Sequence, residues 1–127
     1  MNHFDKGIDC YERKDFLNAD FHFKQVLAEK GLQAETLDYL ARCRLMLADS
    51  RGALELFNQI LEIKPTWDKP YEGKARIYAD RGDYAEAEAL ARRALMLQSK
   101  SAPAWAVLGY ICERTARLKE AKSYYLK

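Results

Sequence analysis

Residues 37–65 read LDYLARCRLMLADSRGALELFNQILEIKP. Apolar residues in this stretch recur every three or four positions on both sides of the Ala48-Asp49-Ser50 segment, which is the spacing of amphipathic helices. The stretch does not alternate polar and apolar residues as a half-buried strand does. Pro65 closes the second run, because proline lacks an amide hydrogen and crowds the preceding turn. The stretch therefore predicts two helices joined by a short turn.

The same pattern returns every 34 residues along the chain, in three registers. The first helix of each unit carries a small residue, the second carries an alanine, and a third position follows four residues after that alanine. These registers are Gly7, Ala41, Ala75 and Gly109, then Ala19, Ala53, Ala87 and Ala121, then Phe23, Phe57, Ala91 and Tyr125. Paired small residues allow two helix backbones to approach closely, with a bulky side chain beside the contact. A fixed period of this length indicates a repeat architecture.

The spacing predicts an all-α fold with two helices in each of about four repeats. We expect helices near 2–14, 17–30, 34–48, 51–63, 68–81, 84–97, 102–115 and 118–127. The expected turns within repeats are Lys14-Asp15, Ala48-Asp49-Ser50, Arg81-Gly82-Asp83 and Thr115-Ala116-Arg117. The chain is then a single domain over 1–127, with repeats at about 1–33, 34–67, 68–101 and 102–127. The last repeat is incomplete, which suggests a fragment of a longer protein or a partner that covers that end.

Composition places the chain among folded proteins, because 49% of its residues are hydrophobic and 31% are charged. No run approaches the ~18 apolar residues of a membrane span, and acids stand where a signal peptide would be apolar. We therefore expect a cytoplasmic protein without a membrane partner. Three cysteines without CxxC spacing suggest reduced thiols, and the shared register of Cys10 and Cys112 predicts that both pack between helices.

Patterns for other chemistry are weak. The two histidines, His3 and His22, fall on different helices outside any metal or nucleophile motif, so surface histidines are the better interpretation. The glycines are scattered and form no phosphate-binding loop. A net charge of +2 without a nucleic-acid motif does not predict RNA or DNA binding. We expect no metal, no cofactor and no enzymatic activity.

The three registers resemble the tetratricopeptide repeat over essentially the whole chain. In the fourth repeat, Trp105, Leu108 and Gly109 match the opening W-x-x-L-G of that family, and Ala121 and Tyr125 match its later positions. The second repeat matches through Leu37, Leu40, Ala41, Ala53, Phe57, Ile60 and Pro65, and the third through Tyr71, Ala75, Tyr78, Ala87 and Ala94. The resemblance implies an α-α superhelix whose concave groove is lined by the first helix of each repeat.

The resemblance also implies which side chains line that groove. Those that we expect to contact a peptide are Tyr11, Tyr39, Arg42, Met46, Lys69, Arg76, Tyr110 and Arg114. Arg42, Arg76 and Tyr110 share one repeat position, and their donors suit carboxylates and carbonyls of a peptide. The alternative is that this row is solvated or paired with neighbouring acids. Members of the family that grip the carboxylate tail of heat-shock chaperones use lysine, asparagine and arginine at positions that here hold Phe4, Ile8, Tyr39 and Gly73, with only Lys69 fitting.

The first hypothesis is a non-catalytic scaffold that binds a peptide segment of a partner protein in its groove. The second is self-assembly into a homo-oligomer through uncapped terminal repeats. The third is a regulatory or targeting part of a larger enzyme or signalling protein. Trp67, in the turn between the second and third repeats, either covers the junction of those repeats or anchors a partner.

Overall fold

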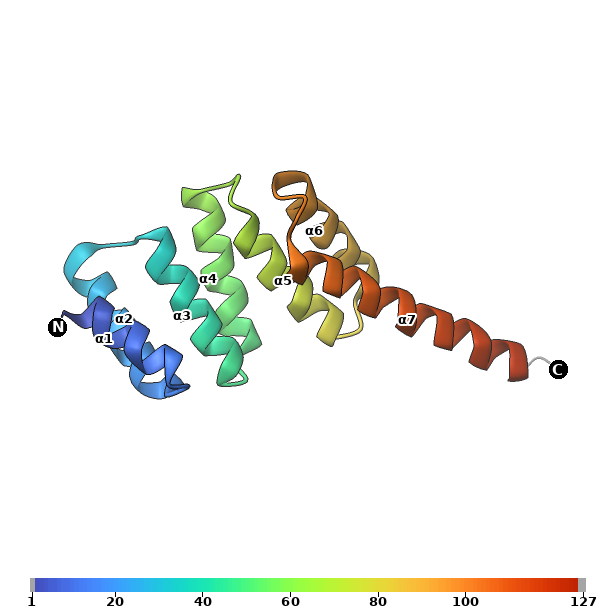
Figure 1. Cartoon of the computed structure of the whole chain (residues 1–127), viewed down its shortest axis with the longest axis horizontal. Helices are drawn as coiled ribbons and strands as arrows, with labels where there is room; N and C mark the ends of the chain where they lie inside the picture. The colour runs from blue at the N-terminus through green and yellow to red at the C-terminus, as the bar shows by residue number, and fades with distance from the viewer. Residues whose placement is uncertain (1, 126–127) are drawn as a thin grey trace. The chain divides into compact units, whose positions relative to one another are not determined.

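The computed structural model describes the backbone of residues 2–125 and the side chains of residues 2–116. All regular structure in that part is helical, as Figure 1 shows. The helices are α1 (His3–Glu12), α2 (Phe16–Lys30), α3 (Ala34–Met46), α4 (Ser50–Ile63), α5 (Asp68–Asp80), α6 (Tyr84–Leu97) and α7 (Ala102–Tyr125). Within the described range, no helix combines the length and apolar character needed to cross a bilayer.

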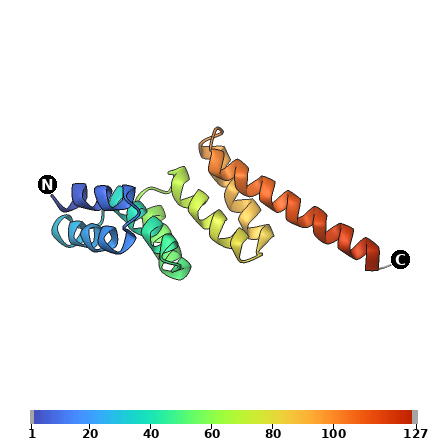
Figure 2. The ribbon, with the colours of Figure 1, turned by 60° about the horizontal axis from the view of Figure 1, so that its bottom comes forward.

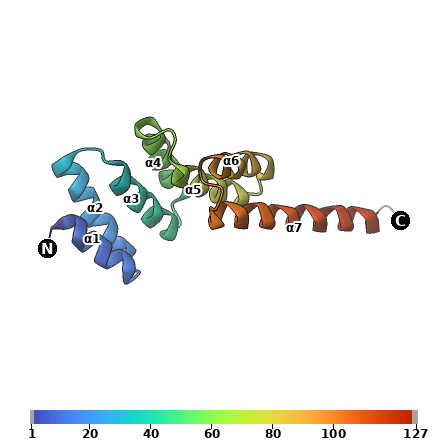
Figure 3. The same cartoon turned by 45° about the horizontal axis from the view of Figure 1, so that its top comes forward.

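The chain forms two compact units, Met1–Pro70 and Tyr71–Lys127. In the first unit, α1 pairs with α2 and α3 pairs with α4, and α2 also packs against α3 (Figure 3). Its core joins Cys10, Ala19, Phe23, Leu40 and Cys43. In the second unit, alanines of α5 and α6 pack together with the apolar face at the start of α7. The expectation of one domain over 1–127 stays a prediction.

Three turns within repeats have the same construction. Lys14, Ala48 and Gly82, spaced 34 residues apart, all have positive φ, at 64°, 64° and 84°. The amide of the next residue, an aspartate in each case, donates to a carbonyl five residues back, at 2.8–2.9 Å. Such left-handed residues end helices by satisfying their last carbonyls. These aspartates, Asp15, Asp49 and Asp83, are also the N-cap residues of α2, α4 and α6. The first three predicted turns are confirmed.

The small residues lie where the helices of a hairpin approach most closely. Gly7, Ala41 and Ala75 are buried, and Ala19, Ala53 and Ala87 are fully inaccessible. A Cβ atom added to Gly7 would lie only 2.7 Å from Cε1 of Phe23. The repeat registers therefore describe real helix contacts in the first three repeats.

The fourth predicted turn is wrong. Residues 115–117 are helical, so the two helices expected over 102–115 and 118–127 are one 24-residue helix, α7. The equivalent of Lys14, Ala48 and Gly82 is Ala116, and since Ala48 also makes a turn, the difference lies at the next position, where Arg117 replaces the three N-cap aspartates. The Thr115 hydroxyl donates to the Ile111 carbonyl at 2.9 Å, inside the continuing helix. Local chemistry at this point thus favours helix over turn. Figure 2 shows α7 running back along α6 and continuing past the start of α6.

Cys112 lies on this continuous helix and is exposed, so the prediction that it packs between helices is wrong. Its repeat equivalent, Cys10, is buried as expected.

Candidate functional site

The first unit contains a cavity of about 530 Å³ between the exposed sides of α1 and α3 and the start of α5. Side chains of α1, α3 and α5 line it, together with one tryptophan that precedes α5. The lining residues are Phe4, Ile8, Tyr11, Glu35, Asp38, Tyr39, Arg42, Trp67 and Lys69. Its apolar lining, which we call the aromatic wall, consists of Phe4, Ile8, Tyr11 and Tyr39, and charged side chains of α3 and α5 lie among these residues. Sites that bind peptides or small ligands combine apolar surface with a few polar groups in this way.

Tyr39 is the centre of the aromatic wall. Its ring stacks on the buried ring of Phe23, with centroids 5.2 Å apart and planes 13° apart. Phe4 and Tyr11 meet Tyr39 edge-on, at 6.0 Å and 5.5 Å. Stacked and edge-to-face arrangements are the favoured geometries of aromatic pairs. The wall is therefore fixed by the hydrophobic core beneath it.

Arg42 is held in place by three neighbours. Its Nε lies 3.4 Å from Oδ1 of Asp38, one helical turn earlier on α3. Its Nη2 donates to the backbone carbonyl of Lys69 at 3.3 Å, and its guanidinium lies 5.4 Å from the centroid of the Phe57 ring. A guanidinium fixed in this way loses little further entropy when it binds a ligand.

Burial changes the proton affinity of two groups that line the cavity. It raises the pKa of the Asp38 carboxyl above its ordinary value of 3.8, and the opposing charge of Arg42 reduces that effect. Burial likewise raises the pKa of the Tyr11 hydroxyl above 10.0. Tyr11 is therefore a neutral phenol near pH 7 and can donate a hydrogen bond.

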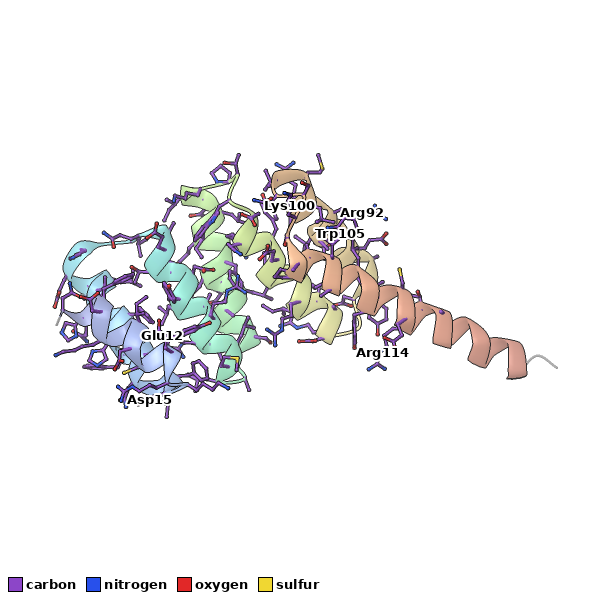
Figure 4. The ribbon with its side chains drawn as sticks, in the orientation of Figure 1. Glu12, Asp15, Arg92, Lys100, Trp105 and Arg114 are labelled. Carbon is purple, nitrogen blue, oxygen red and sulfur yellow. The ribbon has the colours of Figure 1, made fainter. Side chains whose placement is uncertain are left out.

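Four of the eight predicted contact residues meet in this cavity: Tyr11, Tyr39, Arg42 and Lys69. Met46 is exposed at the end of α3 and does not line it. The other three belong to the second unit. There Arg76 is exposed, and the guanidinium of Arg114 lies 5.1 Å from the centroid of the half-buried Tyr110 ring. Figure 4 labels Arg114 on α7.

Arg42, Arg76 and Tyr110, which share one repeat position, have different surroundings in the structure. The alternative of pairing with a neighbouring acid holds for Arg42, which lies beside Asp38. Glu72, an acid of the third repeat, is buried within the second unit, where its carboxylate accepts from the Ser101 hydroxyl. That hydroxyl also accepts from the amide of Ala104 at 3.2 Å and so caps α7.

From the sequence, Trp67 was expected either to cover the junction of the second and third repeats or to anchor a partner. Its half-buried ring lines the cavity, and Nζ of Lys64 lies 5.2 Å from the ring centroid. A second cavity of about 460 Å³ shares Phe4 and Glu35 with the first and continues toward the Leu32 loop. The sequence feature that drew attention to Trp67 was its position as an aromatic residue in the turn between two repeats.

The histidines are closer together than the sequence indicates. Nδ1 of His3 and Nδ1 of His22 are 3.0 Å apart on neighbouring helices, and Nε2 of His3 lies 3.8 Å from Glu29. Burial, together with the charge of the other histidine, lowers the pKa of His22. Among the side chains that the structure describes, no three metal-ligating groups converge.

Comparison with known proteins assigns the family. A sequence model of the tetratricopeptide repeat matches residues 69–101 and 102–127. Residues 69–127 belong to the tetratricopeptide-repeat family, and the recognition of this repeat in the sequence is confirmed. The predicted all-α repeat fold is confirmed, because solved domains of this family share it over most of their length.

Three solved structures illustrate the likeness. The first repeat domain of Spaghetti (RPAP3), bound to the HSP90 peptide SRMEEVD, aligns with a TM-score of 0.81 at 16% identity, over 90% of each chain. The Arabidopsis OM64 domain aligns with a TM-score of 0.82 at 20% identity, over 88% of this chain and 93% of its own. The second domain of human RPAP3, in complex with the HSP70 peptide SGPTIEEVD, gives 0.77 at 17%, over 87% and 92%. At these identities the likeness shows the fold.

Proposed function

We propose that this protein is a non-catalytic interaction module that binds an extended peptide segment of a partner in the cavity of its first unit. The observation that carries the proposal is the pairing of a rigid aromatic wall with a fixed guanidinium in one cavity. Two of the structurally similar domains are bound to peptides, which supports this mode of action.

The cavity favours a peptide with an apolar anchor. Phe4, Ile8 and Tyr39 present ring and aliphatic surface, so an aromatic or large aliphatic side chain is the complementary group. Lys69 is exposed at the rim and favours an acidic residue beside that anchor. Arg42 adds donors for peptide carbonyls.

The side chains that would contact a peptide are already held in place in the unbound protein. The aromatic rings rest on Phe23, which is fully buried, and Arg42 is already held by Asp38 and the Lys69 carbonyl. Binding then orders the peptide but little of the protein. The adjoining cavity shares Phe4 and Glu35 with this one, so a longer segment has a second hollow to contact beside the first.

The same lining argues against capture of the C-terminal carboxylate of a chaperone tail. The peptides SRMEEVD and SGPTIEEVD, bound by the similar domains, end in an aspartate that carries the terminal carboxylate. Phe4, Ile8 and Tyr39 offer little charge compensation for a free C-terminus. Both peptides also contain apolar residues next to acids, so we expect SRMEEVD to bind no more tightly than the same peptide with an amidated C-terminus when each is titrated by calorimetry. A clear preference for the free carboxylate would contradict the assigned specificity.

Selection from a library of random linear peptides tests the proposal. We expect wild-type protein to enrich sequences with an apolar anchor and a neighbouring acid. Lys69→Glu should abolish that preference because it reverses the charge at the rim. Lys100→Glu, an exposed position in the second unit, makes the same charge change and should select the same peptides as wild type. Identical selections by all three proteins, or no enrichment, would refute binding in this cavity.

A further inference from the structure

The pair formed by His3 and His22 lies outside the two cavities described above. His3 is the first residue of α1, and His22 lies in the middle of α2, which packs along α1 (Figure 1). Their Nδ1 atoms are 3.0 Å apart, and both side chains are half-buried. The sequence contains no other histidine. Packing of α1 on α2 therefore brings together both imidazole rings of the chain.

The surroundings of the two rings favour neutral imidazoles whose Nδ1 atoms face each other. Burial, and then the charge of His3, lower the pKa of His22, so its ring is neutral near pH 7. Nε2 of His3 lies 3.8 Å from Oε1 of Glu29. A carboxylate beside Nε2 favours the tautomer of His3 that carries its proton there, which leaves a lone pair on Nδ1. In that tautomer the hydrogen bond between the rings is donated by Nδ1 of His22.

The separation of the two Nδ1 atoms is that of neighbouring ligands on one metal ion. Two nitrogens that each lie about 2.1 Å from an ion are about 3.0 Å apart when the angle at the ion is about 90°. A tetrahedral ion would hold them roughly 3.4 Å apart. The observed 3.0 Å therefore fits neighbouring positions of a square-planar or octahedral ion. Imidazole nitrogens in such an arrangement suit Ni²⁺ and Cu²⁺.

We propose that His3 and His22 form a two-imidazole site for a divalent transition-metal ion of this kind, which joins the start of α1 to the middle of α2. Each ring turns about its side-chain bonds so that its Nδ1 lone pair points at the ion, and water molecules fill the remaining positions. The proton on Nδ1 of His22 moves through water to Nε2 of the same ring, so both rings stay neutral and no proton is released. This site departs from the expectation that the chain binds no metal.

The charges near the pair determine which cations it can select. The charge of Lys6 on α1 lowers the pKa of His22, and the start of α1 carries a partial positive charge, so both act against any cation. Glu29 on α2 offsets them from the side of His3. The affinity must therefore come from bonds to the imidazole nitrogens. Mg²⁺ and Ca²⁺, which prefer oxygen ligands, should not bind.

Isothermal titration calorimetry with Ni²⁺ tests the proposal, on protein without a histidine tag and with Mg²⁺ as the control ion. His3→Gln and His22→Gln each remove one ligand. Glu12→Gln removes an exposed carboxylate elsewhere on α1 and is the control for weak binding by surface acids. Circular dichroism confirms that each variant keeps its helix content. Because the sequence has two histidines, NMR of the imidazole nitrogens reports on the site directly.

We expect wild type and Glu12→Gln to bind one Ni²⁺ per chain with equal affinity, and each histidine variant to bind it roughly tenfold more weakly or worse. The signals of both imidazoles should change together during the titration. Affinity should fall as the solution is made acidic, because protons compete for the same nitrogens. A wild type that binds no Ni²⁺ at millimolar concentration would overturn the proposal. So would binding that His22→Gln leaves unchanged, because the ion would then be held without α2.

Discussion

Replacing Gly7 by alanine tests how closely α1 and α2 approach, and the effect can be worked out from the structure. The added Cβ would lie 2.7 Å from Cε1 of Phe23 and 2.9 Å from Cδ1 and Cζ. Unbonded carbon atoms prefer about 3.5–4.0 Å, so the overlap is roughly 1 Å. Phe23 is fully buried and stacks on Tyr39, which leaves the ring no free direction to move.

Two contributions of opposite sign set the result. Overpacking a tight core costs about 1–3 kcal/mol, while alanine gains about 1 kcal/mol over glycine within a helix. Gly7→Ala should therefore lower the free energy of unfolding by about 0–2 kcal/mol. Gly109→Ala is the matched control, since it lies at the same repeat position with open space around it. In dilute, monomeric protein it should raise stability by about 1 kcal/mol.

Urea denaturation followed by circular dichroism measures both variants. The two effects should differ by about 1–3 kcal/mol, which is the overpacking cost alone. Because Phe23 supports Tyr39, Gly7→Ala should also disturb the aromatic wall of the cavity. If Gly7→Ala stabilised the protein as much as Gly109→Ala does, the close approach of α1 and α2 would be refuted, and so would the reason given for the small-residue register.

Two further predictions concern buried polar groups. Ser101→Ala should destabilise the second unit by about 2–3 kcal/mol in urea denaturation, because it removes the cap of α7 and a hydrogen bond to the buried Glu72 carboxylate. The control Ser99→Ala changes an exposed side chain and should leave the free energy of unfolding almost unchanged. The raised pKa of Asp38 means that its carboxyl binds a proton more tightly in the folded state than in the unfolded chain. The protonated carboxyl therefore adds to folding stability below pH 3.8, and this contribution is lost as pH rises through the folded pKa. The stability of Asp38→Asn relative to wild type should therefore increase from pH 3 to pH 7, and a constant or falling difference would contradict the burial of this carboxyl.

The sequence predicts those features of the fold that depend on local, repeated signals. The positions of α1 to α6 and the Gly82-Asp83 turn follow from helical periodicity and turn chemistry, which act over a few residues. The break expected at Thr115-Ala116-Arg117 was inferred from the period alone, although this segment lacks the glycine and aspartate of the earlier turn. Local chemistry prevailed there, and the exposure of Cys112 follows from it.

The candidate site was predictable in part. Tyr11, Tyr39, Arg42 and Lys69 meet because the repeat places the first helices of successive repeats side by side, although the four residues hold different positions of the repeat. Contacts that depend on particular side chains could not be read from the period. The hydrogen bond between Glu72 and Ser101 and the close approach of His3 and His22 join positions outside the repeat registers.

The measurement that tests the central claim most directly is a titration of isotope-labelled protein with a peptide selected from the random library, followed by backbone amide NMR shifts. The account predicts shifts concentrated at Phe4, Ile8, Tyr39, Arg42 and Lys69, the lining of the first unit's cavity. It also predicts affinity weakened by roughly tenfold or more in Lys69→Glu and unchanged in Lys100→Glu. Shifts confined to the second unit, or equal affinity for both variants, would contradict peptide recognition by this cavity.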